Sequence, residues 1–225
     1  MLLREAGFEF QQMSPPFADP AHPQGAQAAE PASPPVAATL AMELAREKAV
    51  SLARRLVQRG EVDRPTVLLG ADTICVASDG SLIGQPIDAE HARRMIRSFV
   101  GATHDVVSGV ALLRLEPGDD AAALDDESCE TFADTVPVTF GDLADDVLDA
   151  YIAGGQWRGK AGGYNLFDRQ AAGWPITVPP DADATTVVGL PMRKLVRALQ
   201  RWGVEPGRSL RQSEATADPR RAARG

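Results

Sequence analysis

The segment that most constrains the fold of this chain is residues 66–76, which read Thr-Val-Leu-Leu-Gly-Ala-Asp-Thr-Ile-Cys-Val. Its short apolar run, rich in β-branched residues, predicts a buried strand. Asp72 lies in the middle of this run. An ionised carboxylate taken out of water costs several kcal/mol unless a cation or hydrogen-bond donors meet it. The segment therefore predicts a strand in the core, and Asp72 is the first candidate for chemistry.

The composition predicts a soluble cytoplasmic protein with enough material for one large domain. The chain has 225 residues, of which 44% are hydrophobic and 24% charged, and its formal net charge is -8. This charge argues against partners such as nucleic acid or a membrane surface, which need a basic face, but a few local cations could still bind a small anion. Cys75 and Cys129 lie in apolar runs and are expected to be buried free thiols. No apolar run approaches the ~20 residues that span a bilayer.

The pattern along the chain predicts a single α/β domain over residues 1–204. Residues 14–38 are rich in Pro and Ala and read as an irregular loop, and residues 205–225 read as a disordered tail. Between them helices and hairpins alternate, which predicts a mixed sheet flanked by helices. We expect helices over 39–58, from a cap at Asp88 to residue 99, from a cap at Asp142 to residue 152, and from Pro191 onward. We expect strands over 66–76, 104–115, 128–140, 174–178 and 185–188, with an Asp-Gly hairpin turn at 77–81.

Lys48 is a second residue that the pattern marks as unusual. It lies four residues after Leu44 and four before Leu52, on the helix face that those leucines bury. One reading is a lysine that extends to solvent from the rim of the core. The other is an ammonium that reaches the cleft holding Asp72 and meets a phosphate there.

A glycine-rich stretch around Lys160 is the third candidate. Glycines at 154, 155, 159, 162 and 163 leave backbone N–H groups free to approach an anion, although a flexible turn explains them equally well. The lysine precedes the last glycines, so this is no Walker A loop. His104 is read as a structural histidine. An acid in a strand with two lysines suits phosphate chemistry, in which the carboxylate holds a divalent cation or takes a proton from water.

Five ordered blocks of residues carry a family resemblance. They are Leu69-Gly70-Ala71-Asp72-Thr73, Gly84-Gln85-Pro86, residues 101–106 (Gly-Ala-Thr-His-Asp-Val), residues 160–164 (Lys-Ala-Gly-Gly-Tyr) and residues 187–191 (Val-Val-Gly-Leu-Pro). In this order they resemble Maf-type nucleoside triphosphate pyrophosphatases, over roughly residues 2–202. The resemblance implies an elongated α/β unit with a mixed sheet and a central cleft. It also implies hydrolysis of a nucleoside triphosphate to a monophosphate and pyrophosphate with Mg²⁺ or Mn²⁺.

The resemblance assigns roles to single residues. Asp72 matches the family's proton acceptor and is also the metal-ligand candidate, and Thr73 matches a position tied to nucleobase choice. Lys48 and Lys160 match lysines of the cleft. Gln85 stands where the family carries a lysine, and Phe167 where members acting on dTTP and UTP carry a glutamine; we expect both at the substrate.

The chain also departs from the family pattern. A Ser-x-Ser-Pro-Arg-Arg loop precedes the Leu-Leu pair in family members, whereas here Leu2 and Leu3 follow Met1 directly. We expect the native start to lie upstream. The alternatives are a catalytically impaired nucleotide-binding regulator of cell division, or a structural protein whose acid is fortuitous. A homodimer is left open.

Overall fold

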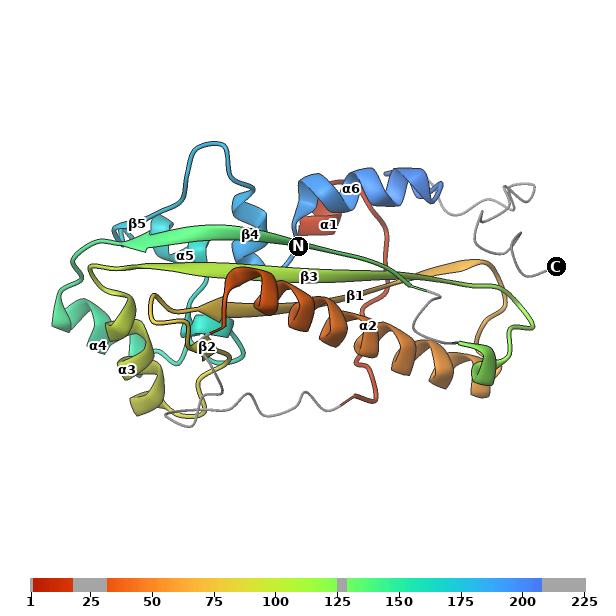
Figure 1. Ribbon diagram of the computed structural model, residues 1–225, viewed down its shortest axis with the longest axis horizontal. Coiled ribbons are helices and arrows are strands. Elements are labelled where there is room, and N and C mark those ends of the chain that lie inside the picture. Colours follow the sequence, from red (N-terminus) through yellow and green to blue (C-terminus); the bar gives the residue numbers. More distant parts are fainter. Residues whose placement is uncertain (1, 18–31, 125–128, 208–225) are drawn as a thin grey trace.

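Three long antiparallel strands form the backbone of the molecule, and the computed structural model describes residues 2–17, 32–124 and 129–207. The sheet order is β2-β1-β3-β4-β5, and every ladder is antiparallel. The molecule is elongated along these strands (Figure 1). The strands are β1 (Thr66–Val76), β2 (Leu82–Ile83), β3 (Thr103–Leu115), β4 (Cys129–Phe140) and β5 (Ile176–Thr177).

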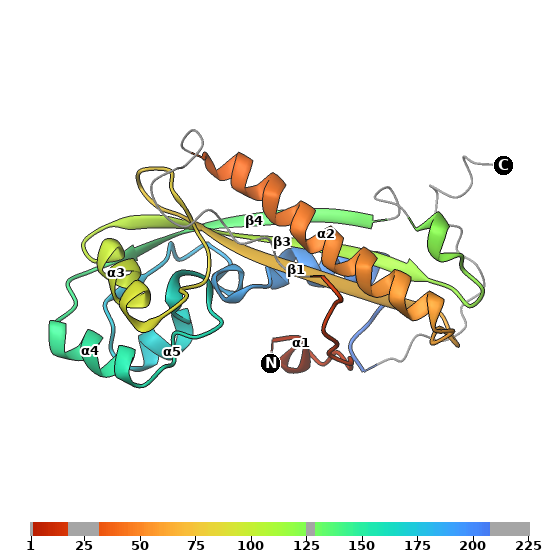
Figure 2. The same ribbon diagram turned by 90° about the horizontal axis from the view of Figure 1, so that it is seen from below.

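One helix, α2 (Pro34–Gln58), covers one face of the long strands (Figure 2). The contact is close because small residues meet: Ala41 and Ala45 of the helix are fully buried, and Gly70 and Gly109 face them from the sheet. A Cβ on Gly109 would lie 2.5 Å from the carbonyl oxygen of Ala41. These two glycines therefore set how near α2 comes to β1 and β3.

The opposite face is covered by helix α6 (Met192–Arg201), the short helix α1 (Leu2–Glu5) and the 3₁₀ turn η4 (Ala184–Val188). Leu195 and Leu199 of α6 pack with Phe8 against Val110 and Leu112 of β3. Successive residues of a strand point to opposite faces. Even-numbered residues of β1 therefore face α2, and odd-numbered ones face α6 and η4.

The remaining elements gather at one end of the sheet around the largest core cluster (Figure 1). They are α3 (Ala89–Phe99), α4 (Asp145–Ala153), α5 (Leu166–Ala171) and the 3₁₀ turn η3 (Ala161–Gly163), while the 3₁₀ turn η1 (Ala121–Ala123) lies at the other end. Asp88 caps α3 as expected, accepting from the backbone N–H of His91. The ring of His104 stacks on Phe99 with centroids 3.9 Å apart.

Several expectations need correction. Residues 185–188 form part of η4 and no strand, because the Asp183 carboxylate accepts from the backbone N–H of Thr185 and turns the chain, and Gly189 (φ 102°) ends the turn. Helix α4 begins at Asp145 and has Ala144 as its cap; Asp142 does not cap it, because Gly141 is still bonded to Pro175 beside the sheet.

Other boundaries differ less. Helix α2 begins at Pro34, five residues before the expected start, because proline suits a first helical turn. Residues 34–38 therefore belong to this helix and not to the expected loop 14–38. Residues 18–31 of that loop lie outside the described residues. Among the described residues, the parallel component of the expected mixed sheet is a single isolated bridge between Val100 and Phe140. The domain limit at 204 stays a prediction, since 208–225 also lie outside the described residues. Within the described part, no helix is long and apolar enough to cross a membrane.

Candidate active site

An ion pair joins the two residues that the sequence marked as unusual. The ammonium nitrogen Nζ of Lys48 lies 2.6 Å from Oδ1 of Asp72, and the side chains are only 17% and 9% exposed. The long helix supplies the lysine and the central strand the acid. The structure places the Lys48 ammonium at Asp72, as the second reading expects, while its contact with a phosphate stays a prediction. The pair balances the cost of holding an ionised carboxylate in the sheet.

Thr73 follows Asp72 directly but projects from the other face of the sheet. Its hydroxyl oxygen Oγ1 lies 2.8 Å from Oγ of Ser108, and a Cβ added to Gly189 beyond η4 would lie 3.5 Å from it. Within the described residues β2 pairs only with Cys75 and Val76, so at Asp72 and Thr73 strand β1 pairs on one side alone. A ligand that touches both side chains must pass around this edge.

A polar row across the second face escaped the sequence analysis. Thr73, Ser108 and Asp134 are directly opposite one another on β1, β3 and β4. Ser108 Oγ donates to the carbonyl oxygen of Thr186 over 2.7 Å, and Thr186 Oγ1 donates to Oδ2 of Asp134 over 2.8 Å. Ser108 and Thr186 are fully buried. The available signal was a serine inside the apolar run of β3, the same kind of signal that identified Asp72.

The Gln85 and Lys160 blocks lie next to each other near the end of β1. The backbone N–H of Gly162 donates to the carbonyl oxygen of Gly84 over 3.0 Å, and a Cβ on Gly162 would lie 3.1 Å from Sγ of Cys75. Cys75 is three residues beyond Asp72, a strand rise of about 10 Å. The ammonium of Lys160 donates to the carbonyl oxygen of Gln156 in its own loop. The structure thus brings together Asp72 and Lys48, whereas substrate contacts of Gln85 and Lys160 stay predictions.

Phe167, the last of the expected substrate residues, is 41% exposed on α5. Two cavities, of about 270 and 460 Å³, lie between the β2 hairpin and α3 and between α4 and α5. Neither is lined by Asp72 or Phe167. The central cleft over Asp72 therefore stays a prediction.

His104 is structural, as expected from the sequence. Its Nε2 lies 2.9 Å from the hydroxyl of Tyr164, and burial lowers the pKa of His104 to about 4. Burial likewise raises the pKa of Tyr164 well above its usual value. Both groups are neutral at pH 7, so their contact in the core is uncharged.

The carboxylate of Asp72 fits one common way of binding a divalent cation. The described ranges hold no group of three or more His, Cys, Asp or Glu side chains that could enclose an ion. Mg²⁺, however, is commonly held by one or two carboxylates together with substrate phosphates and water. Asp72 fits that mode, as the single protein carboxylate of a cation that arrives with a nucleotide.

Comparisons with known proteins show the family of this chain. The chain matches the family described as "Maf-like protein" over residues 1–202. It is 39% identical over 168 residues to the dTTP/UTP pyrophosphatase of Salinibacter ruber, covering 74% of this chain and 76% of that protein. The dTTP/UTP pyrophosphatase of Pyrococcus furiosus is 33% identical over 161 residues, 71% of this chain and 73% of its own. A human protein, the probable bifunctional dTTP/UTP pyrophosphatase/methyltransferase protein, is 35% identical over 159 residues, 71% of this chain and 24% of its own. The chain belongs to the Maf-like family.

Proposed function

We propose that this protein is a nucleoside triphosphate pyrophosphatase, which hydrolyses a (d)NTP to the monophosphate and pyrophosphate. The observation that carries the proposal is the ion pair of Lys48 with Asp72 at 2.6 Å inside the sheet. Its support is the family membership, together with relatives named dTTP/UTP pyrophosphatases. UTP and dTTP are accordingly the first substrates to test, followed by triphosphates of non-standard bases.

The proposed chemistry divides between the two partners of the pair. Water attacks the α-phosphorus, its oxygen forms a bond to that atom, and the bond from the α-phosphorus to the bridging oxygen breaks as pyrophosphate leaves. The Asp72 carboxylate takes the proton from the attacking water. Lys48 holds that carboxylate in position and can turn its ammonium toward the phosphates, where negative charge develops.

We also propose a divalent cation, Mg²⁺ or Mn²⁺, held by Asp72 and the nucleotide's own phosphates. Such an ion would neutralise charge on the phosphate oxygens. The requirement is tested by adding a chelator and then restoring each metal. A rate that does not change under chelation would contradict this part of the proposal.

The decisive experiment measures pyrophosphate release from a panel of nucleoside triphosphates by wild type and by Asp72→Asn. We expect the variant to lose at least about 100-fold in rate, a typical contribution of a positioned general base. Asp149→Asn is the matched control, because Asp149 pairs with Arg93 on the surface of α4 and is 52% exposed. Hydrolysis in ¹⁸O-labelled water adds a second readout: the label must appear in the monophosphate.

Two outcomes would point elsewhere. Equal rates for wild type and Asp72→Asn would remove Asp72 from the chemistry. Tight nucleotide binding without release would favour the alternative of a nucleotide-binding regulator. One observation favours that alternative: the exposed residue in the Gly84-Gln85-Pro86 turn is neutral, so the described site carries less positive charge than the resemblance implies.

A further inference from the structure

A half-buried arginine, Arg169 of α5, lies in the wall of the larger cavity, between α4 and α5 (Figure 2). Its guanidinium carbon lies 4.5 Å from the ring centre of Tyr151 and 5.3 Å from that of Trp174. The two rings meet edge to face, with their centres 5.0 Å apart. Both residues are only 5% exposed, so the guanidinium rests on an aromatic surface that holds it in place.

This contact leaves most of the hydrogen-bond donors of Arg169 unused. A guanidinium carries five N–H groups and a full positive charge. Among the described residues its side chain makes one hydrogen bond, from Nη2 to Oε1 of Gln156 over 2.9 Å, and no ion pair. Its Nε has no acceptor in the same part of the chain. A guanidinium fixed in this way, without a counter-ion, is suited to binding a carboxylate in the cavity.

An acidic side chain lines the same cavity. Asp146 lies in the first turn of α4 and is exposed, and its Oδ1 accepts from the backbone N–H of Val147 over 2.9 Å. Asp145 and Asp149 of the same helix pair with arginines of α3, whereas Asp146 has no ion pair with any residue that the structure describes. The described wall of the cavity therefore carries one unpaired charge of each sign.

The two charges restrict the class of ligand. A phosphate or a dicarboxylate would meet Asp146 as well as Arg169, and an amine without an acid group would meet Arg169; bringing like charges together costs free energy. A zwitterion avoids both costs. The rest of the wall includes small apolar side chains from both helices, among them Val147, Ala150 and Ala172, which suit an aliphatic group.

We propose that this cavity binds a free α-amino acid with an aliphatic side chain, its carboxylate on Arg169 and its ammonium on Asp146. The volume of about 460 Å³ is sufficient for such a molecule. The proposal goes beyond nucleotide hydrolysis, because neither Asp72 nor Lys48 lines this cavity. Its tests measure binding alone, so they hold whether or not the protein releases pyrophosphate.

The first test titrates wild type with L-leucine and with two analogues that each lack one charged group. Isocaproate lacks the ammonium and isoamylamine lacks the carboxylate. We expect a dissociation constant of about 1 mM for leucine by calorimetry, since charges open to water are screened, and about tenfold weaker binding of each analogue. An analogue that binds as tightly as leucine overturns the proposal, as does a leucine titration without saturation or tighter binding of inorganic phosphate.

NMR titration then shows where leucine binds. The side-chain signals of Gln156 and Trp174, which line the cavity, should shift with the dissociation constant that calorimetry gives. Signals that shift elsewhere, and not at these two side chains, would place the ligand outside the cavity and overturn the proposal.

Two variants separate the charged contacts. Asp146→Asn should bind leucine about tenfold more weakly but isocaproate no more weakly than wild type does. Arg169→Met, which keeps an apolar cover on the rings, should bind leucine about tenfold more weakly but isoamylamine no more weakly. Equal weakening of leucine and its analogue in either folded variant would indicate lost packing and overturn the proposal. Asp146 is exposed, so its variant remains informative if Arg169→Met fails to fold.

Asp149→Asn and Arg158→Met are the matched controls. Asp149 lies on α4 but pairs with Arg93 and does not line the cavity. The guanidinium carbon of Arg158 likewise lies over an aromatic ring, 4.6 Å from the centre of Trp157, and also lies outside the cavity wall. Both variants should bind leucine as wild type does. A loss equal to that of the cavity variants would mean that distant charge, and not contact, determines binding, and the proposal would fall.

Discussion

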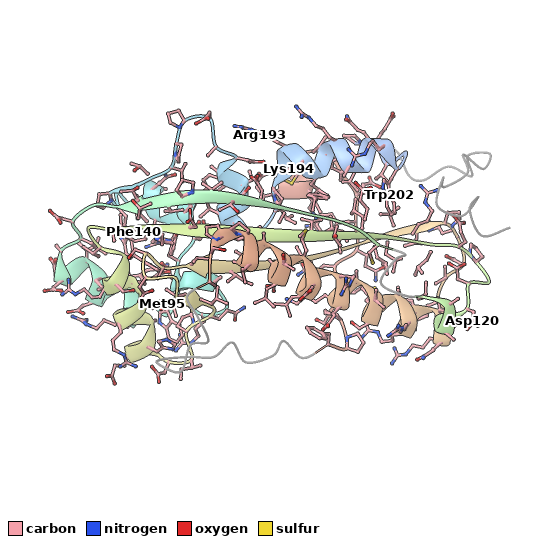
Figure 3. The ribbon with its side chains drawn as sticks, viewed as in Figure 1. Met95, Asp120, Phe140, Arg193, Lys194 and Trp202 are labelled. Carbon is pink, nitrogen blue, oxygen red and sulfur yellow. The ribbon has the colours of Figure 1, made fainter. Side chains whose placement is uncertain are left out.

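Two lysine–aspartate pairs lie on opposite faces of the same sheet and are nearly equal in length. Lys48 and Asp72 are 2.6 Å apart under α2, and Lys194 and Asp134 are 2.7 Å apart under α6. Their exposure differs: 17% and 9% for the first pair, 51% and 20% for the second. Figure 3 labels Lys194 near the start of α6, on the side of the sheet away from α2.

The comparison shows that burial, more than distance, decides what such a pair does. An exposed pair is screened by water and contributes little. A pair shielded from water interacts strongly, and removing one partner leaves an uncompensated charge. The Lys48 face is therefore expected to carry the charge-dependent chemistry, while the ion pair on the Lys194 face is screened by water.

We expect the largest effect from Gly109→Ala, which would push α2, and Lys48 with it, away from the sheet. The new Cβ would lie 2.5 Å from the carbonyl oxygen of Ala41 and from the backbone nitrogen of Met42. We expect a loss of about 3 kcal/mol in the free energy of unfolding, measured by urea denaturation, because backbone atoms cannot yield as side chains do. Gly154→Ala is the control, since its φ is -68° and its added Cβ makes ordinary contacts. Equal stability of the two variants would contradict the close packing.

The face of the sheet opposite α2 should be sensitive to acid through His104. Its folded pKa is about 4 and its ordinary value 6.5, so below pH 6.5 the unfolded chain binds a proton that the folded chain does not. Stability is thus fully present above pH 6.5, is lost as the pH falls to about 4, and levels off below that. The loss is on the order of 3 kcal/mol, measured by denaturation across this range. His104→Gln, which keeps a group for the Tyr164 hydroxyl, should remove this component; an unaltered pH profile would contradict it.

Lys48→Met tests the buried pair directly. It removes the Lys48 ammonium from the Asp72 carboxylate, whose side chain is only 9% exposed. We expect a loss of about 2 kcal/mol in stability, less than for a fully buried pair because water reaches part of the site. The rate of pyrophosphate release should also fall by about 100-fold, because no Lys48 ammonium then stabilises the negative charge that develops on the phosphates. The double variant Lys48→Met with Asp72→Leu should recover much of the stability and none of the rate.

The pattern of residues found the buried pair because both signals are local. The apolar run with flanking turns gives β1 its observed bounds, Thr66–Val76, and the helical period places Lys48 on the face that meets the sheet. Cross-strand partners are not local. Thr73 meets Ser108 only through the register of β1 on β3, and Thr186 meets Asp134 from 52 residues away in the chain. The spacing of residues in the sequence does not predict the register of β1 on β3.

Local chemistry also overrode β propensity at one point. Residues 185–188 are Thr-Thr-Val-Val, which favours a strand, yet they form a 3₁₀ turn. Asp183 accepts from both the backbone N–H and the hydroxyl of Thr185, and this side chain–backbone bonding competes with strand pairing. The same turn brings Thr186 over Ser108, so the missed turn and the missed polar row have one cause.

Lys194→Met gives the smallest expected effect and sharpens the comparison most. Because Lys194 is 51% exposed, we expect a change of about 0.5 kcal/mol or less in unfolding free energy. Asp134 keeps its bond from Thr186 in this variant, so the turn that bears Thr186 stays attached to β4. The rate of pyrophosphate release should therefore equal that of wild type, in contrast to Lys48→Met. A loss comparable to that of Lys48→Met would mean that pair length, and not burial, decides the contribution of these charges.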